Sequence, residues 1–233
     1  MSQQGRAPGT PPWRGRLRPV AAAVALLGAA ALVPLVRVLG GDGAAALTPG
    51  SYVPQRSGEV LTYRLGGSLR ATVELRLASR GVIAGVPTLS VEQLGTPSST
   101  ILPFGLSGGT VRIKGDTVVR TAEGGTVRDL VGPVAPGTRW SDTRHTAAAG
   151  GGGSTFTVTE DRTLLGPASL DEPYGRLDRC LVVAVSSSAT SAGGAVSAAG
   201  ATLWYCEGVG LARAVLRGGA AGDTVDLVAV GGA

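Results

Sequence analysis

Alternation of apolar and polar residues is the feature that most limits how this chain can fold. In the stretch SLRATVELRLASR, the odd-numbered positions from Leu69 to Leu77 are apolar, and the positions between them carry Arg, Thr and Glu. Side chains of an extended strand point alternately to its two faces, so this period of two indicates a strand with one buried face. The segments SGEVLTYRLGG and GGTVRIKGDTVVRTA repeat the pattern. We therefore expect an antiparallel sheet built from hairpins.

Glycine-containing turns separate such segments from Ser51 to the end of the chain. Short strands at regular spacing are typical of a sandwich, an open barrel or a strongly curved sheet. We predict an all-β fold: a single antiparallel, strongly curved sheet or open half-barrel, preceded by one N-terminal hydrophobic helix. Because aromatic residues make up only 4% of the sequence, the core must be built largely from Val, Leu and Ala.

The excess positive charge of the chain is confined to its N-terminal segment. Residues 1–40 contain no Asp or Glu, and their arginines account for the whole net charge of +5: Arg6, Arg14, Arg16, Arg18 and Arg37. The rest of the chain is balanced and has no basic stripe of the kind that binds phosphates. Nucleic acid is therefore not an expected partner.

The segment VAAAVALLGAAALVPLV, residues 20–36, is uncharged and indicates a membrane address. As a helix it would span roughly 25 Å, near the lower limit for crossing a bilayer. Most of the N-terminal arginines precede it, so the positive-inside rule places the N-terminus in the cytoplasm. The predicted organisation is a basic cytoplasmic tail (1–19), a transmembrane signal anchor or signal peptide (20–37), a linker (38–50) and an extracytoplasmic β domain (51–233).

Two versions of this address remain open. An uncleaved anchor would make a single-pass cell-membrane protein, whereas cleavage near Ala46 would release a secreted domain. The small residues Ala44–Ala46 suit a cleavage site, but they lie well beyond the apolar run, with Arg37 between. This spacing favours the anchor. A lipoprotein anchor is not expected, because no cysteine follows the apolar stretch.

The two cysteines, Cys180 and Cys206, are placed to form a disulfide. If CLVVAV and ATLWYC form a hairpin that turns at Gly193–Gly194, opposite residues have numbers that sum to 386 or 387, and 180 + 206 is 386. Opposite positions on adjacent strands are close to the separation that a disulfide prefers. An exported domain also lies where disulfides persist. Two buried free thiols or a reactive cysteine are the alternatives.

Residues that could carry catalysis are present singly, without a motif that joins them. His145 is the only histidine, and Asp142 could orient it as a general base only if a nucleophile lay nearby. Lys114 stands at a strand-to-turn position typical of an exposed charge. One histidine and two distant cysteines do not make a zinc site. We predict no catalytic residue, no metal site and no cofactor.

Carboxylates offer the one enzymatic alternative, a cell-wall hydrolase that uses a pair of acids. The neighbours Glu160–Asp161 and Asp171–Glu172 would point to opposite faces of a strand and cannot pair by themselves. Acids from different strands could converge only through the tertiary structure; the candidates are Glu59, Glu74, Glu92 and Glu160. Two carboxylates within roughly 5–10 Å in one cleft would support this alternative.

Several short motifs, taken in order, resemble a family of exported bacterial β-sheet domains of unknown function. They are SYVPQRSGEVLTYRL near the start, VAPGTRW in the middle, and DRCLVVAV followed by LWYCEGVGLARA near the end. The positions that carry the resemblance are Tyr52, Pro54, Gly58, Tyr63, Gly137, Trp140, Cys180, Tyr205, Gly208, Val209, Gly210 and Arg213. Some members of this family resemble curved, half-barrel envelope carriers that shield a lipid. The resemblance offers no catalytic residues, and its lipoprotein members differ from this chain, which lacks a cysteine to be lipidated.

Together these features predict a membrane-anchored or secreted extracytoplasmic β domain without catalytic activity. It would contact the membrane through residues 20–36 and bind an apolar ligand, such as a lipid, or an envelope protein partner. A curved sheet of Val, Leu and Ala could leave a groove for such a ligand. If the concave face is instead filled by its own side chains, a structural envelope protein without a ligand is the alternative.

Overall fold

The computed structural model describes residues 47–67, 70–95, 108–122, 125–147, 155–191, 193–194, 196–217 and 223–232. All of them belong to one structural unit, Leu35–Ala233. The predicted tail (1–19), the predicted anchor or signal peptide (20–37) and most of the predicted linker lie outside the described residues. Among the residues that are described, no helix is long and apolar enough to cross a membrane.

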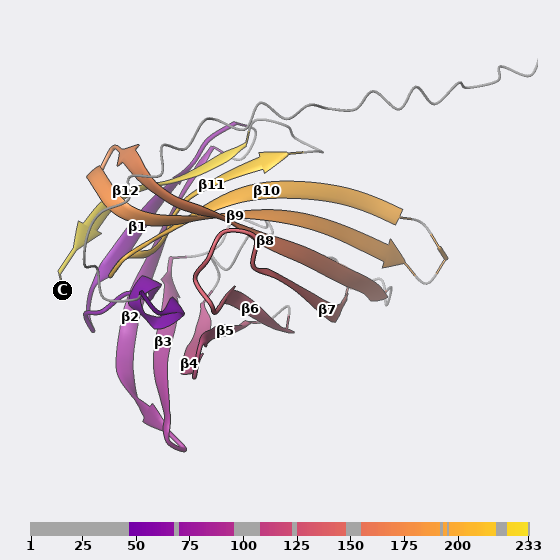
Figure 1. The fold of residues 1–233 in the computed structure, drawn as a ribbon. Helices are drawn as coiled ribbons and strands as arrows, with labels where there is room; N and C mark the ends of the chain where they lie inside the picture. Colours follow the sequence, from indigo (N-terminus) through magenta and orange to yellow (C-terminus); the bar gives the residue numbers. More distant parts are fainter. Residues whose placement is uncertain are drawn as a thin grey trace, which may run out of the picture. The chain divides into compact units, whose positions relative to one another are not determined.

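The described chain forms a short 3-10 helix followed by antiparallel strands (Figure 1). The elements of the first half are η1 (Pro49–Tyr52), β1 (Val60–Leu65), β2 (Ala71–Ile83), β3 (Val86–Leu94), β4 (Gly109–Lys114), β5 (Thr117–Ala122) and β6 (Gly125–Val131). Those of the second half are β7 (Arg139–Ala147), β8 (Thr155–Glu172), β9 (Gly175–Ser191), β10 (Val196–Cys206), β11 (Gly210–Arg217) and β12 (Thr224–Gly231). The predicted all-β character is confirmed.

All strands belong to one 12-stranded sheet with the order β6-β5-β4-β3-β2-β1-β12-β11-β10-β9-β8-β7. Each half of the chain is therefore a meander in which every strand pairs with the next one in sequence. The two meanders join where the first strand pairs with the last, as Leu61 opposite Val230 and Leu65 opposite Val225 show. Every strand pairing in the sheet except one thus joins strands that are consecutive in sequence, and that single long-range pairing sets the topology.

The sheet curves until its two edge strands, β6 and β7, approach each other, so it is nearly closed and goes further round than the predicted half-barrel. Trp140 Nε1 on β7 donates a hydrogen bond to the Arg128 carbonyl on β6, at 2.8 Å. The Arg128 amide and guanidinium both donate to Asp142, at 3.0 and 2.8 Å. We call these contacts the β6–β7 seam. Side chains close the seam, since no β6–β7 backbone ladder is part of the sheet.

Irregular pairing explains much of this curvature. The register shifts at Thr62/Tyr63, Leu77/Ser79, Val118/Val119 and Trp204/Tyr205, and twice in the long strand β8. An extra residue on one strand increases the local twist and bends the strand. Because the shifts occur in both meanders, the bending accumulates from each side until the edge strands meet.

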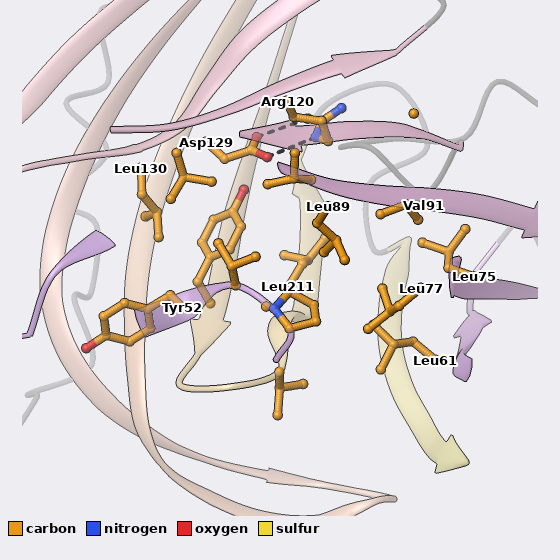
Figure 2. Close-up of a pocket in the computed structure, with 18 of the residues that line it drawn as sticks. Tyr52, Leu61, Leu75, Leu77, Leu89, Val91, Arg120, Asp129, Leu130 and Leu211 are labelled. Carbon is orange, nitrogen blue, oxygen red and sulfur yellow. Dashed lines mark hydrogen bonds and ion pairs between the residues drawn. The ribbon is translucent and has the colours of Figure 1, made fainter. Parts of the chain in front are cut away.

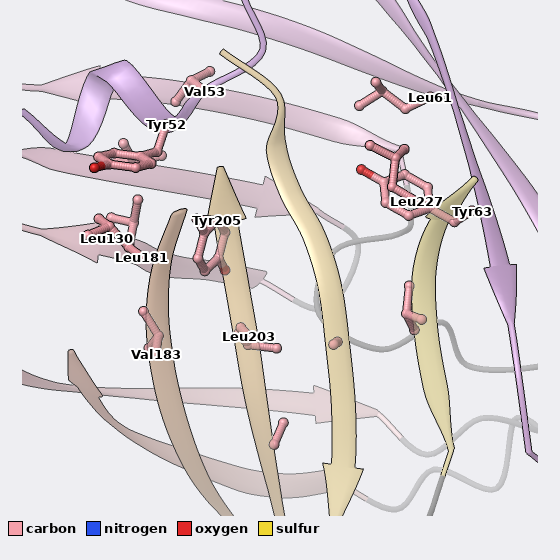
Figure 3. Packing of buried hydrophobic residues seen from close by; sticks show 14 of the residues in the cluster. Tyr52, Val53, Leu61, Tyr63, Leu130, Leu181, Val183, Leu203, Tyr205 and Leu227 are labelled. Atoms are coloured by element: carbon pink, nitrogen blue, oxygen red, sulfur yellow. The ribbon is translucent and has the colours of Figure 1, made fainter. Parts of the chain in front are cut away.

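The concave face of the sheet carries the main core, which is drawn from both halves of the chain. Val73, Leu75 and Leu77 of β2 are buried, whereas Thr72, Glu74 and Arg76 between them are exposed, as the alternation predicted. In Figure 3, Tyr52 and Val53 lie on the same side of the sheet as Val183, Leu203 and Tyr205. The segment that contains η1 therefore packs across the concave face.

A smaller apolar cluster on β8, β9, β10 and β11 contains the disulfide. Cys180 and Cys206 are direct register partners and form the bond, so the predicted pairing is confirmed. They pack with Leu170 and Ala212, which are also buried. By the chain-entropy relation, closing a loop with a sequence separation of 26 contributes about 3 kcal/mol to the free energy of unfolding.

Candidate functional site

The concave face holds one notable cavity, of about 80 Å³, among the residues that the structure describes. Its wall is mainly apolar and comes from β1 to β6, β10 and β11 together with the η1 segment. In Figure 2, Leu61, Leu75 and Leu77 lie on one side, and the Arg120–Asp129 pair lies at another end. The cavity therefore combines a broad apolar wall with one polar corner.

The segment Pro49–Pro54, which we call the plug, closes one side of this cavity. Tyr52 and Val53 are buried in the main core, and both line the cavity with Pro54. The Gly208 amide donates a hydrogen bond to the Ser51 carbonyl, at 2.9 Å. A proline at the helix start suits the plug, because proline fixes φ without sacrificing a needed amide donor.

Gly210 is the position where the plug and the sheet come closest. Its φ is +88°, and a Cβ atom there would lie 2.9 Å from Pro54 Cδ. Any side chain would therefore both strain the backbone and push the plug away from the cavity. The first and last motifs of the resemblance thus meet in space: Tyr52 and Pro54 lie against Gly208 and Gly210.

Two buried tyrosines complete the cavity wall. Tyr63 donates its hydroxyl hydrogen to the Leu211 carbonyl, at 2.8 Å. Tyr205 interacts with Arg162 and lies near Asp129. Burial raises the pKa of both phenols well above the ordinary value, with Asp129 adding to the effect at Tyr205. Both groups therefore stay protonated; Tyr63 donates its hydroxyl hydrogen, whereas the Tyr205 oxygen accepts a hydrogen bond from the Arg162 guanidinium.

An ion-pair network lies behind the polar corner. Arg120 binds Asp129 through two nitrogens, at 2.9 and 3.0 Å. Arg162 bridges Asp129, at 3.4 Å, and Glu160, at 2.8 Å. Arg144 completes the network by contacting Glu160 at 2.7 Å. The side chain of Arg162 is only 1% exposed, so its charge depends on these partners rather than on water.

The network keeps Glu160, Arg120 and Arg162 charged despite their burial. Burial disfavours the Glu160 carboxylate, but Arg162 and Arg144 outweigh that effect and hold its pKa below the ordinary value. Burial likewise opposes the charge of Arg120, and Asp129 more than compensates, so the Arg120 pKa is raised. The Arg120–Asp129 pair that reaches the cavity is neutral as a unit, and its donors are largely engaged. This corner is therefore better suited to holding β5 and β6 together than to transferring protons.

Sequence reasoning missed this network because it assigned charged residues to the solvent face. The signal was present on β8, where Glu160 and Arg162 occupy the same face as Val158 and Leu164. Two opposite charges within an otherwise apolar face indicate a buried pair. Asp161, next to Glu160, is exposed, as the analysis of that dipeptide predicted.

The structure does not bring the candidate catalytic residues together. His145 is exposed and its Nδ1 contacts the Thr157 hydroxyl at 3.2 Å, whereas Asp142 belongs to the β6–β7 seam. Lys114 is exposed beside the β4–β5 turn, as expected. Glu92 pairs with Arg76 on the exposed face, Glu74 is exposed, and Glu160 lies in the buried network. These acids therefore do not converge in one cleft.

A second charged cluster lies where the end of β8 meets β11 and β12. Arg213 contacts Glu172 at 3.7 Å and Asp226 at 3.3 Å, and its guanidinium lies over the Trp204 ring, 5.7 Å from the centroid. Burial and the neighbouring Asp226 raise the pKa of Glu172 to about 7, although Arg213 and Arg64 oppose the shift. Arg213, one of the positions that carry the family resemblance, therefore has a structural role: its ion pairs link the end of β8 to β12.

Other family-like positions also have structural roles, either in backbone turns or in the β6–β7 seam. Gly58 and Gly137 have φ of +81° and +88° and donate hydrogen bonds to the Leu77 and Leu164 carbonyls. Trp140 bridges the seam. The positions that the motifs single out therefore shape the corners of the sheet and its cavity.

Comparison with known proteins identifies a shared fold. No family model matches the chain, and no curated protein matches it. A solved structure of a "putative lipoprotein" from Parabacteroides distasonis ATCC 8503 aligns with a TM-score of 0.61 and 11% identity, over 77% of this chain and 98% of that one. An exported-protein structure from Bacteroides fragilis NCTC 9343, described as having a YmcC-like fold, aligns with a TM-score of 0.47 and 10% identity, over 80% and 100% of the two chains. At this identity, the Parabacteroides structure shows similarity of fold alone.

Proposed function

We propose that this protein is a non-catalytic, extracytoplasmic binding domain that is held at the cell membrane and accepts the apolar end of a ligand beneath its plug. The apolar cavity on the concave face is the observation that carries the proposal. The disulfide fits an oxidising compartment. The uncharged segment 20–36 and the arginines before it support the membrane topology.

The size of the cavity limits what can enter the protein as it stands. Small-molecule sites usually occupy about 300–1,000 Å³, and a dry cavity of about 150 Å³ is enough for benzene. At about 80 Å³, this cavity admits only the end of an acyl chain or a similar small apolar group. A longer chain would have to displace Tyr52 and Val53 of the plug.

The polar corner further limits which ligands the cavity can bind. Arg120 and Asp129 are the charged residues among those that line the cavity, and they pair with each other, so the lining itself offers no unpaired charge to an ionic headgroup. The rest of the wall is Leu, Val and Tyr. A neutral apolar end is therefore the chemistry that the cavity fits, and any charged headgroup would remain outside it.

A structural envelope protein without a ligand is the second candidate, and the packing of the concave face favours it. Leu and Val side chains from both meanders fill most of that face themselves. If the residual cavity is only a packing defect, its apolar lining would leave it dry and empty.

Photo-crosslinking separates these two functions. Membranes that carry the full chain would be incubated with a fatty acid bearing a diazirine near the end of its chain, and the crosslinked peptides would be mapped by mass spectrometry. We expect adducts on cavity residues such as Leu77, Val91 and Leu211. The variant Val91→Phe should abolish them by filling the cavity, whereas Val119→Phe, on β5 and outside the cavity lining, should not. Adducts confined to the surface of the domain would favour the structural role.

A further inference from the structure

The β2–β3 hairpin extends beyond the strands on either side of it (Figure 1). β1 pairs with β2 only as far as Arg76, and β4 pairs with β3 only from Thr88 onwards. The two strands nevertheless continue to pair with each other up to Ile83 opposite Val86. The outer part of the hairpin is therefore a two-stranded projection. We call its end, Val82–Val86, the tip.

The tip is apolar and exposed. Val82 is 68% exposed and Ile83 is 55% exposed, among the largest exposures of big hydrophobic side chains in the described chain. The sequence of the tip is Val-Ile-Ala-Gly-Val, without a polar side chain. Apart from the chain neighbours of Gly85, no described residue places an atom within 4 Å of a Cβ built on Gly85, so none of them packs over the tip at that point.

The turn in the tip keeps its apolar character at a conformational cost. Ala84 and Gly85 connect the strands with φ of +51° and +78°. A two-residue turn with positive φ at both positions favours Asn-Gly or Asp-Gly, because alanine is strained in the left-handed region. Alanine here replaces the polar residue that the turn geometry prefers. Backbone strain that persists on an exposed tip points to a function for its apolar surface.

The base of the hairpin is attached to the segment through which the chain enters the domain. Arg80 Nη1 donates hydrogen bonds to both the backbone carbonyl and the side-chain oxygen of Gln55. The described chain begins at Leu47, and the uncharged run of the predicted anchor ends at Val36. The intervening residues 37–46 can span at most about 35 Å when fully extended. Under the proposed membrane topology, the entry segment to which Arg80 is hydrogen-bonded is therefore tethered within reach of the bilayer.

We propose that the β2–β3 tip inserts into the interface of the bilayer that holds the predicted anchor, and so forms a second membrane contact; this rests on the topology in the proposed function. A protein partner would need roughly 800 Å² of complementary surface, far more than the end of a hairpin offers. The outward backbone groups of the hairpin still need water, so the tip enters only the boundary between headgroups and acyl chains, about 5–10 Å deep.

A fluorophore on the tip tests this insertion in the full chain. The described structure has no free cysteine, because both cysteines of the sequence form the disulfide, so Ile83→Cys introduces a unique thiol for the dye NBD. The labelled chain would be reconstituted in vesicles of phosphatidylethanolamine and phosphatidylglycerol, with or without doxyl-labelled lipid. Val196→Cys is the matched control, since Val196 is 66% exposed at the start of β10 on a different hairpin.

We expect blue-shifted emission and several-fold stronger doxyl quenching at position 83 than at position 196. Adding Val82→Asp should reduce the quenching at position 83, because a charge opposes insertion. Equal quenching at both positions, or none at either, would overturn the proposal. Shielding of position 83 in native membranes but not in lipid vesicles would also overturn it and would indicate a protein partner. Fatty-acid crosslinking reports on the cavity alone, so failure there is distinguishable from failure of insertion.

Discussion

The buried charged residues of this sheet differ in whether their charge depends on pH. Arg162 is surrounded by Asp129, Glu160 and Tyr205, so it remains charged without access to solvent. Removing one partner of such a network leaves an uncompensated charge, which typically costs about 3–5 kcal/mol. Glu172 differs because burial and Asp226 outweigh its cationic neighbours. The Glu172 carboxyl group therefore changes its protonation state near neutral pH.

Stability should fall as pH rises from about 4.5 to about 7. The pKa of Glu172 is raised from 4.5 to about 7 in the folded protein, so between these values the folded state holds a proton that the unfolded state has lost. Arg213, Arg64 and Asp226 are the charged groups that influence it. At about 1.4 kcal/mol per pKa unit, we expect a decrease of about 1–3 kcal/mol in the free energy of unfolding, levelling off above pH 7.

Urea denaturation at pH 5 and pH 8 measures this dependence. The variant Glu172→Gln should remove most of the difference, whereas Glu92→Gln, on the exposed Arg76 pair, should retain it. A wild-type protein with equal stability at both pH values would contradict the role assigned to Glu172.

At the scale of single elements, hairpins show how the pattern of the sequence becomes structure. The β9–β10 hairpin pairs in one register throughout, from Val196 opposite Thr190 to Cys206 opposite Cys180, so counting residues was enough to predict the disulfide. The β2–β3 hairpin alternates on β2 near the body, but its register shifts at Leu77/Ser79 and its outer end lacks neighbouring strands. The turn at that end has an alanine at positive φ, although asparagine would be more stable in this conformation.

The variant Ala84→Asn should separate stability from membrane contact. Asparagine tolerates the left-handed region better than alanine, so we expect about 0.5–1 kcal/mol of added stability, measured by urea denaturation. The polar side chain should at the same time weaken doxyl quenching of a label at position 83. The control is Gly193→Asn, on the β9–β10 turn, which should leave the doxyl quenching of a label at position 83 unchanged. Increased quenching in Ala84→Asn would contradict the role of the apolar tip.

At the scale of the whole sheet, closure depends on a few side chains rather than on a backbone ladder. The β1–β12 pairing joins the two meanders through hydrogen-bonded strands, whereas the β6–β7 seam relies on Arg128, Asp142 and Trp140. Among the described strands, the seam is therefore the junction that opens without breaking a backbone ladder. The cavity and its plug belong to the same concave face.

The variant Asp142→Ala should loosen the seam without unfolding the sheet. It removes the acceptor for both the Arg128 amide and its guanidinium, so amide hydrogen exchange should accelerate in β6 and β7. Exchange in β9 and β10, which pair with neighbours on both sides, should change little. Asp161→Ala, an exposed acid on β8, is the control. Uniform acceleration over all strands would contradict a local role for the seam.

Local pattern was sufficient for much of this protein. Alternation predicted which residues of β2 face the core, glycine turns separated the strands, and residue counting placed Cys180 opposite Cys206, because side-chain direction and hairpin register depend on near neighbours. Tertiary structure alone decided the rest. The β1–β12 pairing and the burial of Arg162 join residues far apart in the chain, the β6–β7 seam forms only because the whole sheet curves, and the remaining volume of the cavity depends on how all the side chains pack. The local sequence pattern contains no information about these tertiary contacts.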